Sequence, residues 1–315
     1  MRNKITDILK KQTNLVILVV LIIILCTAIP SFRQVSNFLN ILKNISVISI
    51  ISCGMTLVVI GGGLDLSVGS TFSLAAVISI VMLNKYNPIL AIIMPIIAAV
   101  IVGILNGVIT SKFNLSSIIV TLGMLSFVGG FALFIVNGGT QVGNPSIVFK
   151  AIAKIQLFKI PLYCYLFIII AIFYEVLLRK TTFGRNLILI GTNPEAAKII
   201  GVNITLVRTI SFVICSLSVA IAAVLLSSRL MTASPTSGIG YEFDAITAIV
   251  IGGTSLSGGK GSIYNTVIGA ILLGVVINAL TLTNVPFAFQ AITKGFLIIL
   301  AIILDVRARS SFEKQ

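Results

Sequence analysis

Long, uninterrupted runs of apolar residues are the feature that most limits how this chain can fold. Each run contains about 16 to 25 residues, and about 20 helical residues suffice to cross the hydrocarbon core of a bilayer. Only 10% of the residues are charged, whereas soluble domains carry about 25%. Apolar and polar residues do not alternate as they would in the strands of a membrane β-barrel. The sequence therefore predicts an all-α polytopic membrane protein.

We predict about ten transmembrane helices in a single transmembrane domain that covers residues 1–315. With the N-terminus in the cytoplasm, ten crossings return the C-terminus to the cytoplasmic side. Of the 22 Lys and Arg residues, 14 then fall on inner segments and seven on outer segments, with Lys294 inside a span. This bias supports the orientation, since Lys and Arg are enriched in cytoplasmic loops. Glycine-broken runs near 61–66 and 250–262 leave eight or nine spans as alternatives. The predicted spans are approximately 15–30, 44–61, 66–83, 88–111, 116–137, 160–178, 209–230, 242–256, 262–283 and 286–305.

The composition also excludes several classes of function. The net charge is +14, but the basic residues lie at the ends of apolar runs and do not line one soluble face, so we predict no nucleic-acid partner. The chain has no His, and its cysteines lie inside apolar runs without the spacing of metal ligands. No pair of residues suited to acid–base catalysis is evident. We therefore predict no catalytic residues, no metal site and no bound cofactor.

The longest predicted outer loop, residues 138–159, contains an amphipathic pattern. Lys150 and Lys154 lie one helical turn apart, and Phe149 and Ile152 can share another face. This pattern predicts a helix that lies along the outer surface.

A weak internal repeat appears when the chain is shifted by 172 residues, the separation of Asn106 and Asn278. The same shift places Thr121 on Thr293 and overlays the stretch VTLGML on ITKGFL without a gap. Because the fourth predicted span runs inward and the ninth outward, the two halves would be inverted repeats. Transporters with a central substrate site use such repeats, so Asn106 and Asn278 become candidates for the translocation path.

Two glycine-rich stretches predict broken helices. In GGGLDLSVGS, residues 61–70, the glycines permit backbone angles that a helix cannot use, and Asp65 or Ser67 can cap the helix that follows. A second break is GGTSLSGGKGS, residues 252–262. An ionisable group inside a span is also a candidate functional residue, so Asp65 and Ser67 are candidates for the translocation path or its gate as well as for a capped turn.

Lys294 is the other charged residue inside a predicted span. It lies about eight residues past Pro286, or roughly 12 Å along a helix from the outer end. Its side chain can snorkel part of that distance, or it can face a polar cavity or a carboxylate partner. We count Lys294 among the candidates for the translocation path.

The remaining acidic residues have ordinary explanations. Glu175 precedes Arg179 by one turn, the favourable order for an ion pair within a helix. Glu242 and Asp244 lie near the start of a predicted helix, where the helix dipole attracts negative charge.

A short polar stretch, GTNPEAAKIIGVN, lies in the longest inner loop, residues 179–208. Asn193 is a good N-cap, Pro194 suits the first helical position, and Gly201 suits the position after the helix end. The predicted helix, about residues 194–200, is too short to be stable alone in water. It must therefore be held by the body of the protein or by a partner.

The stretch Glu195-Ala196-Ala197, followed after three residues by Gly201, resembles the EAA loop of ABC importer permeases. Three longer stretches, GGGLDLSVGS, GRNLILIGTNPEAAKIIGVN and GYEFDAITAIVIGGTSLSGGKGS, resemble in order and spacing the signature stretches of the ribose-type permease family. That family includes permeases for galactose, xylose, arabinose and autoinducer-2. The resemblance covers about residues 40–305, although the usual Ile-x-Leu-Pro-like ending of the EAA loop is absent.

The resemblance implies a permease in the bacterial cytoplasmic (inner) membrane. Its implied partners are a second permease subunit, a cytoplasmic ABC ATPase and an extracytoplasmic sugar-binding protein. It also implies that the 179–208 loop is the cytoplasmic coupling loop, with Asn193, Pro194, Glu195, Ala196, Ala197 and Gly201 contacting the ATPase. The small side chains of Ala196 and Ala197 suit close approach of that partner. ATP would be used by the partner, because this chain has no G-x-x-x-x-G-K-[ST] motif.

A proton-coupled secondary transporter acting alone is the alternative. It would use Asp65 and Lys294 as titrating groups, but it leaves the capped inner helix without a purpose. The sequence does not decide between ribose and the family's other substrates, or between a homodimer and a heterodimer.

Overall fold

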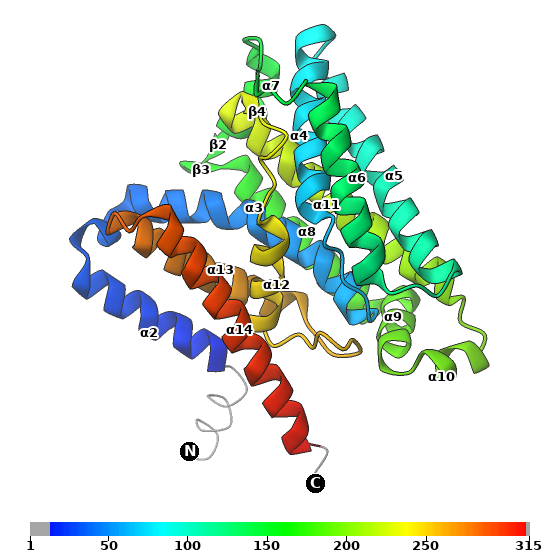
Figure 1. Ribbon diagram of the computed structural model, residues 1–315. Helices are drawn as coiled ribbons and strands as arrows, with labels where there is room; N and C mark the ends of the chain where they lie inside the picture. Colours follow the sequence, from blue (N-terminus) through cyan, green and yellow to red (C-terminus); the bar gives the residue numbers. More distant parts are fainter. Residues whose placement is uncertain (1–12, 313–315) are drawn as a thin grey trace.

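Nearly all of the regular secondary structure is helical in residues 13–312, the part of the chain that this computed structural model describes (Figure 1). Residues 1–12 and 313–315 lie outside the described part. The predicted cytoplasmic placement of the two chain ends therefore falls outside it, as do several basic residues that entered the charge count: Arg2, Lys4, Lys10, Lys11 and Lys314.

Seven of the described helices are long and apolar enough to cross a membrane. With them the prediction of an all-α polytopic membrane protein is confirmed. These helices are α3 (Val35–Ile60), α4 (Val68–Lys85), α5 (Leu90–Lys112), α6 (Ser117–Ile135), α8 (Leu162–Lys180), α11 (Ile204–Leu230) and α13 (Ile263–Leu282).

The other three predicted spans correspond to α2 (Thr13–Ala28), α12 (Tyr241–Ile251) and α14 (Phe287–Phe312). The boundaries predicted for the eighth span, 242–256, are wrong. At 11 residues, α12 is only about 16 Å long, roughly half of the hydrocarbon core. It ends because Gly252 and Gly253 follow, the latter with φ of +80°. A non-helical segment descends from the end of α11 to α12 (Figure 1) and makes up the rest of this pass.

Short elements connect the long helices. At one end of the molecule α9 and α10 form a compact helical pair, and α7 lies at the opposite end (Figure 1); we call the first of these the α10 end. The strands pair as β1 with β4 and β2 with β3, both antiparallel. The short elements are η1 (Pro30–Arg33), β1 (Gln141–Val142), α7 (Ile147–Lys154), β2 (Gln156–Leu157), β3 (Ile160–Pro161), α9 (Thr182–Thr192), α10 (Pro194–Ile199) and β4 (Thr232–Ala233).

The helix predicted in the outer loop is α7. Ser146 caps it by accepting a hydrogen bond from the Phe149 amide at 3.2 Å. Phe149 is buried against the body of the protein, and its carbonyl accepts a hydrogen bond from Ser228 at 2.6 Å. The amphipathic pattern therefore anchors α7 on the end of α11.

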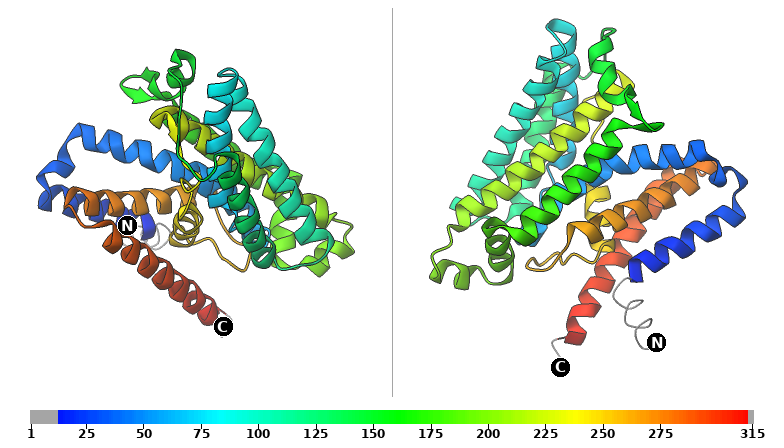
Figure 2. Two further views of the ribbon diagram at one scale, coloured as in Figure 1. Left: turned by 45° about the horizontal axis from the view of Figure 1, so that its top comes forward. Right: turned by 180° about the vertical axis from the view of Figure 1, so that it is seen from behind.

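The core is centred on α3 and α11, which pack against each other. Helix α11 also packs against α4 and α5. Small residues allow this close approach, as is common between membrane helices. A Cβ added at Gly103 of α5 would lie 2.8 Å from the Cα of Val213 in α11, and one at Gly107 would lie 2.5 Å from the Cα of Thr209. On the other side of the molecule, α13 packs against α3, α12 and α2, and α14 packs against α12 (Figure 2).

The helix boundaries follow the 172-residue offset of the predicted repeat. Each helix from α3 to α6 has a counterpart from α11 to α14, and the counterparts run in opposite directions in Figure 1. The repeat is therefore inverted. Adding 172 to the bounds of α3, α4, α5 and α6 gives 207–232, 240–257, 262–284 and 289–307, against observed bounds of 204–230, 241–251, 263–282 and 287–312.

Candidate functional site

The start of α10 has the predicted cap. The Asn193 side chain accepts a hydrogen bond from the Ala196 amide at 3.0 Å, and Pro194 occupies the first helical position. This arrangement satisfies one of the amides that a helix start leaves free. The short helix is therefore well defined at its first turn.

The end of α10 is also the predicted one. Gly201 has φ of +82°, a conformation that glycine adopts without steric cost. Its amide donates to the Lys198 carbonyl at 3.1 Å, and the Val202 amide donates to the Ala197 carbonyl at 3.0 Å. These two bonds make a Schellman motif, which stops the helix sharply.

The body of the protein holds α10 through Ala197, which is completely buried. The prediction that Ala197 faces a partner is therefore wrong, because its side chain packs inside its own chain. The residues that α10 exposes are Pro194, Glu195, Lys198 and Ile199, followed by Ile200. Ile199 and Ile200 are 85% and 68% exposed. Sequence reasoning passed over these two isoleucines, although two adjacent apolar residues in a polar loop were a usable signal.

The helix that precedes α10, α9, contacts the core at a point where residues from three segments meet. The Gly259 amide donates a hydrogen bond to the Ile60 carbonyl, at the end of α3, at 2.9 Å. Gly191, near the end of α9, lies directly against both groups, so a Cβ there would overlap the Ile60 carbonyl oxygen. We call Ile60, Gly191 and Gly259 the glycine joint. It brings α3, α9 and the second predicted helix break, residues 252–262, to one point at the α10 end.

The first predicted helix break is organised around Asp65, which is buried. One Asp65 carboxylate oxygen accepts hydrogen bonds from the Ser67 amide at 3.0 Å and from the Ser67 hydroxyl at 2.6 Å. The Asn106 amide group donates to Ser67 Oγ at 2.8 Å and lies 3.4 Å from the carboxylate. The structure therefore brings three of the five predicted path residues together.

The capping expectation needs a correction at this break. Ser67 is the N-cap residue of α4, but its side chain makes no cap hydrogen bond. Asp65 bonds the Ser67 amide, so it closes a local turn before α4 and does not cap the helix itself. The break is also held from α6, where Ser117 and Thr121 accept hydrogen bonds from the backbone amides of Leu64 and Leu66 at 2.9 and 3.0 Å.

Asn278 does not join the Asp65 cluster. Its side-chain amide pairs reciprocally with that of Asn37 from α3, with N–O distances of 2.8 and 3.1 Å. Two amides matched in this way satisfy each other inside an apolar environment. Asn278 therefore ties α13 to α3. The repeat makes Asn278 the counterpart of Asn106, but the two side chains have different hydrogen-bond partners.

Lys294 has a carboxylate partner, one of the possibilities that the sequence left open. Its Nζ lies 2.8 Å from Asp244 Oδ1 and 2.9 Å from Oδ2. The ordinary explanation given for Asp244 is thus incomplete, since its main partner is Lys294. Glu242 does behave as predicted, because its carboxylate accepts a hydrogen bond from the Gly240 amide at the start of α12 at 3.2 Å.

The predicted Glu175–Arg179 ion pair is present, with a distance of 3.2 Å between Nε and Oε1. The pair has a second role that the sequence did not show. Glu175 Oε2 accepts a hydrogen bond from the Ile263 amide at the start of α13 at 2.8 Å, and Arg179 donates to the Gly261 carbonyl at 3.0 Å. The pair therefore fastens α8 to the end of the second helix break.

Comparison with known proteins agrees with the motifs. The ribose import permease protein RbsC of Bacillus subtilis (strain 168) is 36% identical over 290 residues, which cover 91% of this chain and 90% of that protein. The L-arabinose transport system permease protein AraH of Escherichia coli (strain K12) is 36% identical over 293 residues, covering 92% and 89%. The galactose/methyl galactoside import permease protein MglC of Haemophilus influenzae (strain ATCC 51907 / DSM 11121 / KW20 / Rd) is 33% identical over 323 residues, covering 96% of each chain.

No solved structure matches this chain. A family described as "Branched-chain amino acid transport system / permease component" matches residues 37–304. The match spans nearly the whole described membrane domain and, together with the relatives, confirms the resemblance drawn from the motifs. The chain therefore belongs to this family of transport-system permease components.

Proposed function

We propose that this chain is the membrane subunit of an ATP-driven importer for a monosaccharide, with ribose or a related sugar as substrate. The observation that carries the proposal is α10, a capped two-turn helix that presents Ile199 and Ile200 to the outside while Ala197 anchors it. Adjacent exposed apolar residues of this kind suit a protein interface. The names of the relatives above supply the substrate class.

The occupant of the α10 surface is a cytoplasmic ATPase, which uses ATP on behalf of the complex. A second permease subunit and an extracytoplasmic sugar-binding protein complete the assembly. The permease itself binds no ATP and catalyses no reaction. A homodimer is the simplest arrangement, because only one type of permease chain is then required.

A movement of α10 can be passed directly to the membrane helices. The helix follows α9, and α9 touches α3 and the 252–262 break at the glycine joint. Its other end leads within a few residues to α11, the central helix of the core. A rigid element attached to packed helices can pass on a two-state movement, so motion of the ATPase would shift α3 and α11 together.

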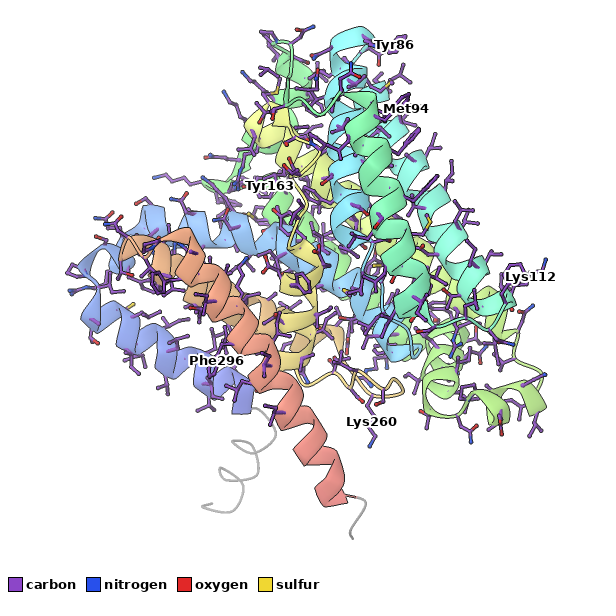
Figure 3. The ribbon with its side chains drawn as sticks, viewed as in Figure 1. Tyr86, Met94, Lys112, Tyr163, Lys260 and Phe296 are labelled. Atoms are coloured by element: carbon purple, nitrogen blue, oxygen red, sulfur yellow. The ribbon has the colours of Figure 1, made fainter. Side chains whose placement is uncertain are left out.

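The orientation that this proposal requires places the α10 end in the cytoplasm, together with both chain termini. Lys112 and Lys260 lie at this end in Figure 3, in agreement with the charge bias expected of a cytoplasmic face. The membrane is then the bacterial inner membrane, and α7 faces the compartment of the binding protein.

The Asp65 cluster and the Lys294–Asp244 pair are the candidate elements of the translocation path or its gate. The Asp65 cluster lies at the break before α4, and Asp244 lies in the first turn of the short helix α12; α4 and α12 correspond in the repeat. Polar groups at such breaks are where transporters built from inverted repeats hold their substrates or gates.

The test targets the exposed face of α10. Changing Ile199 and Ile200 together to Ser leaves the cap, Ala197 and Gly201 intact, so the permease should reach the membrane at a normal level. We expect weak co-purification with the ATPase and loss of ATP hydrolysis stimulated by the loaded binding protein in nanodiscs. Ile147→Ser is the matched control for co-purification with the ATPase, since Ile147 is 90% exposed on α7 at the opposite end. Full association and stimulation in the double variant would rule out α10 as the docking element.

The alternative, a proton-coupled transporter acting alone, is supported by the buried carboxylates of Asp65 and Asp244. It is separated by uptake of labelled ribose into liposomes that contain the permease alone. Uptake driven by a pH gradient without ATPase would support it, whereas uptake that requires the ATPase, ATP and the binding protein supports the importer.

A further inference from the structure

A cavity of about 230 Å³ lies at the α10 end of the molecule, where α3 and α5 end and α6 and α11 begin. It is separate from the exposed face of α10 and from the Asp65 carboxylate, neither of which lines it. Its volume corresponds to roughly eight water molecules at the ~30 Å³ each occupies in the liquid. The cavity can therefore hold a small polar group together with part of the molecule that carries it.

The start of α6 faces this cavity, since Ser116, Ser117 and Ile118 line it. Ser116 is the N-cap residue of this 19-residue helix, and its side chain makes no cap hydrogen bond. The free amides at such a helix start, with the positive end of the helix dipole, form a favourable place for an anion.

Arg208 adds a positive charge to the same cavity. Its Nε donates to the Gly61 carbonyl at 3.2 Å, which fixes the position of the guanidinium group beside the first helix break. Among the ion pairs of the described residues, none involves Arg208, and no carboxylate lines the cavity. The charge of Arg208 is thus not neutralised locally, and a guanidinium group can bind a phosphate through two parallel hydrogen bonds.

Thr110 supplies an independent indication that a ligand belongs here. It lines the cavity, only 5% of its surface is exposed, and its hydroxyl has no hydrogen-bond partner among the described residues. Buried polar groups almost always have a partner. Its hydroxyl oxygen is almost fully enclosed, so a ligand oxygen in the cavity would satisfy it once the Thr110 side chain rotates toward the cavity.

We propose that this cavity binds a phosphate group, held by Arg208, Thr110 and the amides at the start of α6. The phosphate can belong to a soluble ester, such as a sugar phosphate, or to the headgroup of a membrane lipid. Either ligand would join the ends of α3 and α5 to the beginnings of α6 and α11. The site would therefore give the permease a means of regulation by a phosphate-bearing molecule, which goes beyond the transport activity proposed above.

The first experiment titrates inorganic phosphate into the full permease chain, purified in a maltoside detergent without its partners, and follows the melting temperature. Leaving out the ATPase removes the other phosphate-binding protein and makes the result independent of the proposed transport function. We expect a saturable rise that sodium chloride at equal ionic strength does not produce. Arg208→Gln should weaken the apparent affinity by at least about tenfold, as for loss of a charged hydrogen bond.

Thr110→Val should weaken phosphate binding by about threefold while it keeps the shape of the side chain and the charge of Arg208. This variant keeps the test decisive if Arg208→Gln fails to fold. Arg185→Gln is the matched control, because Arg185 is an exposed arginine of α9 that does not line the cavity, and it should bind phosphate like the wild type. Absence of saturable binding, or equal affinity in the wild type and both cavity variants, would overturn a soluble phosphate ligand.

The second experiment separates the two sources of the phosphate group. Phosphate affinity is measured in nanodiscs of phosphatidylglycerol and in detergent, and lipid retained after purification is counted by native mass spectrometry. If the ligand is a lipid headgroup, phosphate should bind at least tenfold more weakly in nanodiscs than in detergent, and Arg208→Gln should abolish lipid retention. A soluble ester predicts equal phosphate affinity in both. If neither phosphate binding nor lipid retention depends on Arg208 and Thr110, the proposal is wrong.

Discussion

Replacing Lys294 by Met tests the ion pair that joins α14 to α12. Met keeps most of the length of the lysine stem and removes its charge. In the wild type Nζ lies within 2.9 Å of both Asp244 carboxylate oxygens, and the Asp244 and Lys294 side chains are 8% and 28% exposed. The variant therefore leaves a nearly buried carboxylate without its partner.

The size of the effect follows from these distances. At 2.8 Å and an effective dielectric constant of about 20, the attraction between the two charges is about 6 kcal/mol. Desolvation of both groups offsets most of this gain, so the intact pair contributes little net stability. Loss of one partner from a buried pair costs about 3–5 kcal/mol. Because Lys294 is partly exposed, we expect the lower end, about 3 kcal/mol, for Lys294→Met.

The double variant Lys294→Met with Asp244→Asn removes both charges and should lie within about 1 kcal/mol of the wild type. The measurement is the free energy of unfolding in mixed micelles for the wild type, both single variants and the double variant, which together isolate the coupling between the two side chains. Lys260→Met is the control, since Lys260 is exposed on the 252–262 break. An unchanged free energy in Lys294→Met, or additive single effects in the double variant, would refute the ion-pair reasoning.

Three further predictions concern the α10 end and the orientation of the chain. In Gly191→Ala the new Cβ would overlap the Ile60 carbonyl oxygen, so this variant should abolish stimulated ATP hydrolysis or lower the yield of folded protein. Gly130→Ala is the control. It has nothing within 4 Å of the new methyl group and should behave like the wild type in both assays. Asn193→Ala removes the cap of α10 and should cost about 1 kcal/mol, seen as faster amide hydrogen exchange in α10 and weaker ATPase association; unchanged exchange would contradict the capping role. A reporter inserted in α10 should be cytoplasmic and one near Asn144 external, and placement of both on the same side would exclude the proposed orientation.

Local rules account for what the sequence determined by itself. The apolar runs located the membrane helices, since a bilayer sets a minimum length for each span. The cap at Asn193 and the positive φ of Gly201 were predictable because each depends on a few neighbouring backbone groups. The 172-residue offset was also readable from the chain, and the helix boundaries of the two halves follow it.

The tertiary structure decided which side of each element is used and which distant residues meet. Ala197 looked like a contact for a partner, yet its burial depends on how α9 and α10 fold back on the core. The partner of Lys294 comes from 50 residues earlier in the chain, and the glycine joint unites three segments that are separated by more than 60 residues. Helical periodicity describes one element at a time, whereas these contacts depend on the angles and distances at which several helices pack. The sequence alone therefore identified the kind of molecule and the capped helix α10, and only the packed structure showed which faces of that helix are buried and which are exposed.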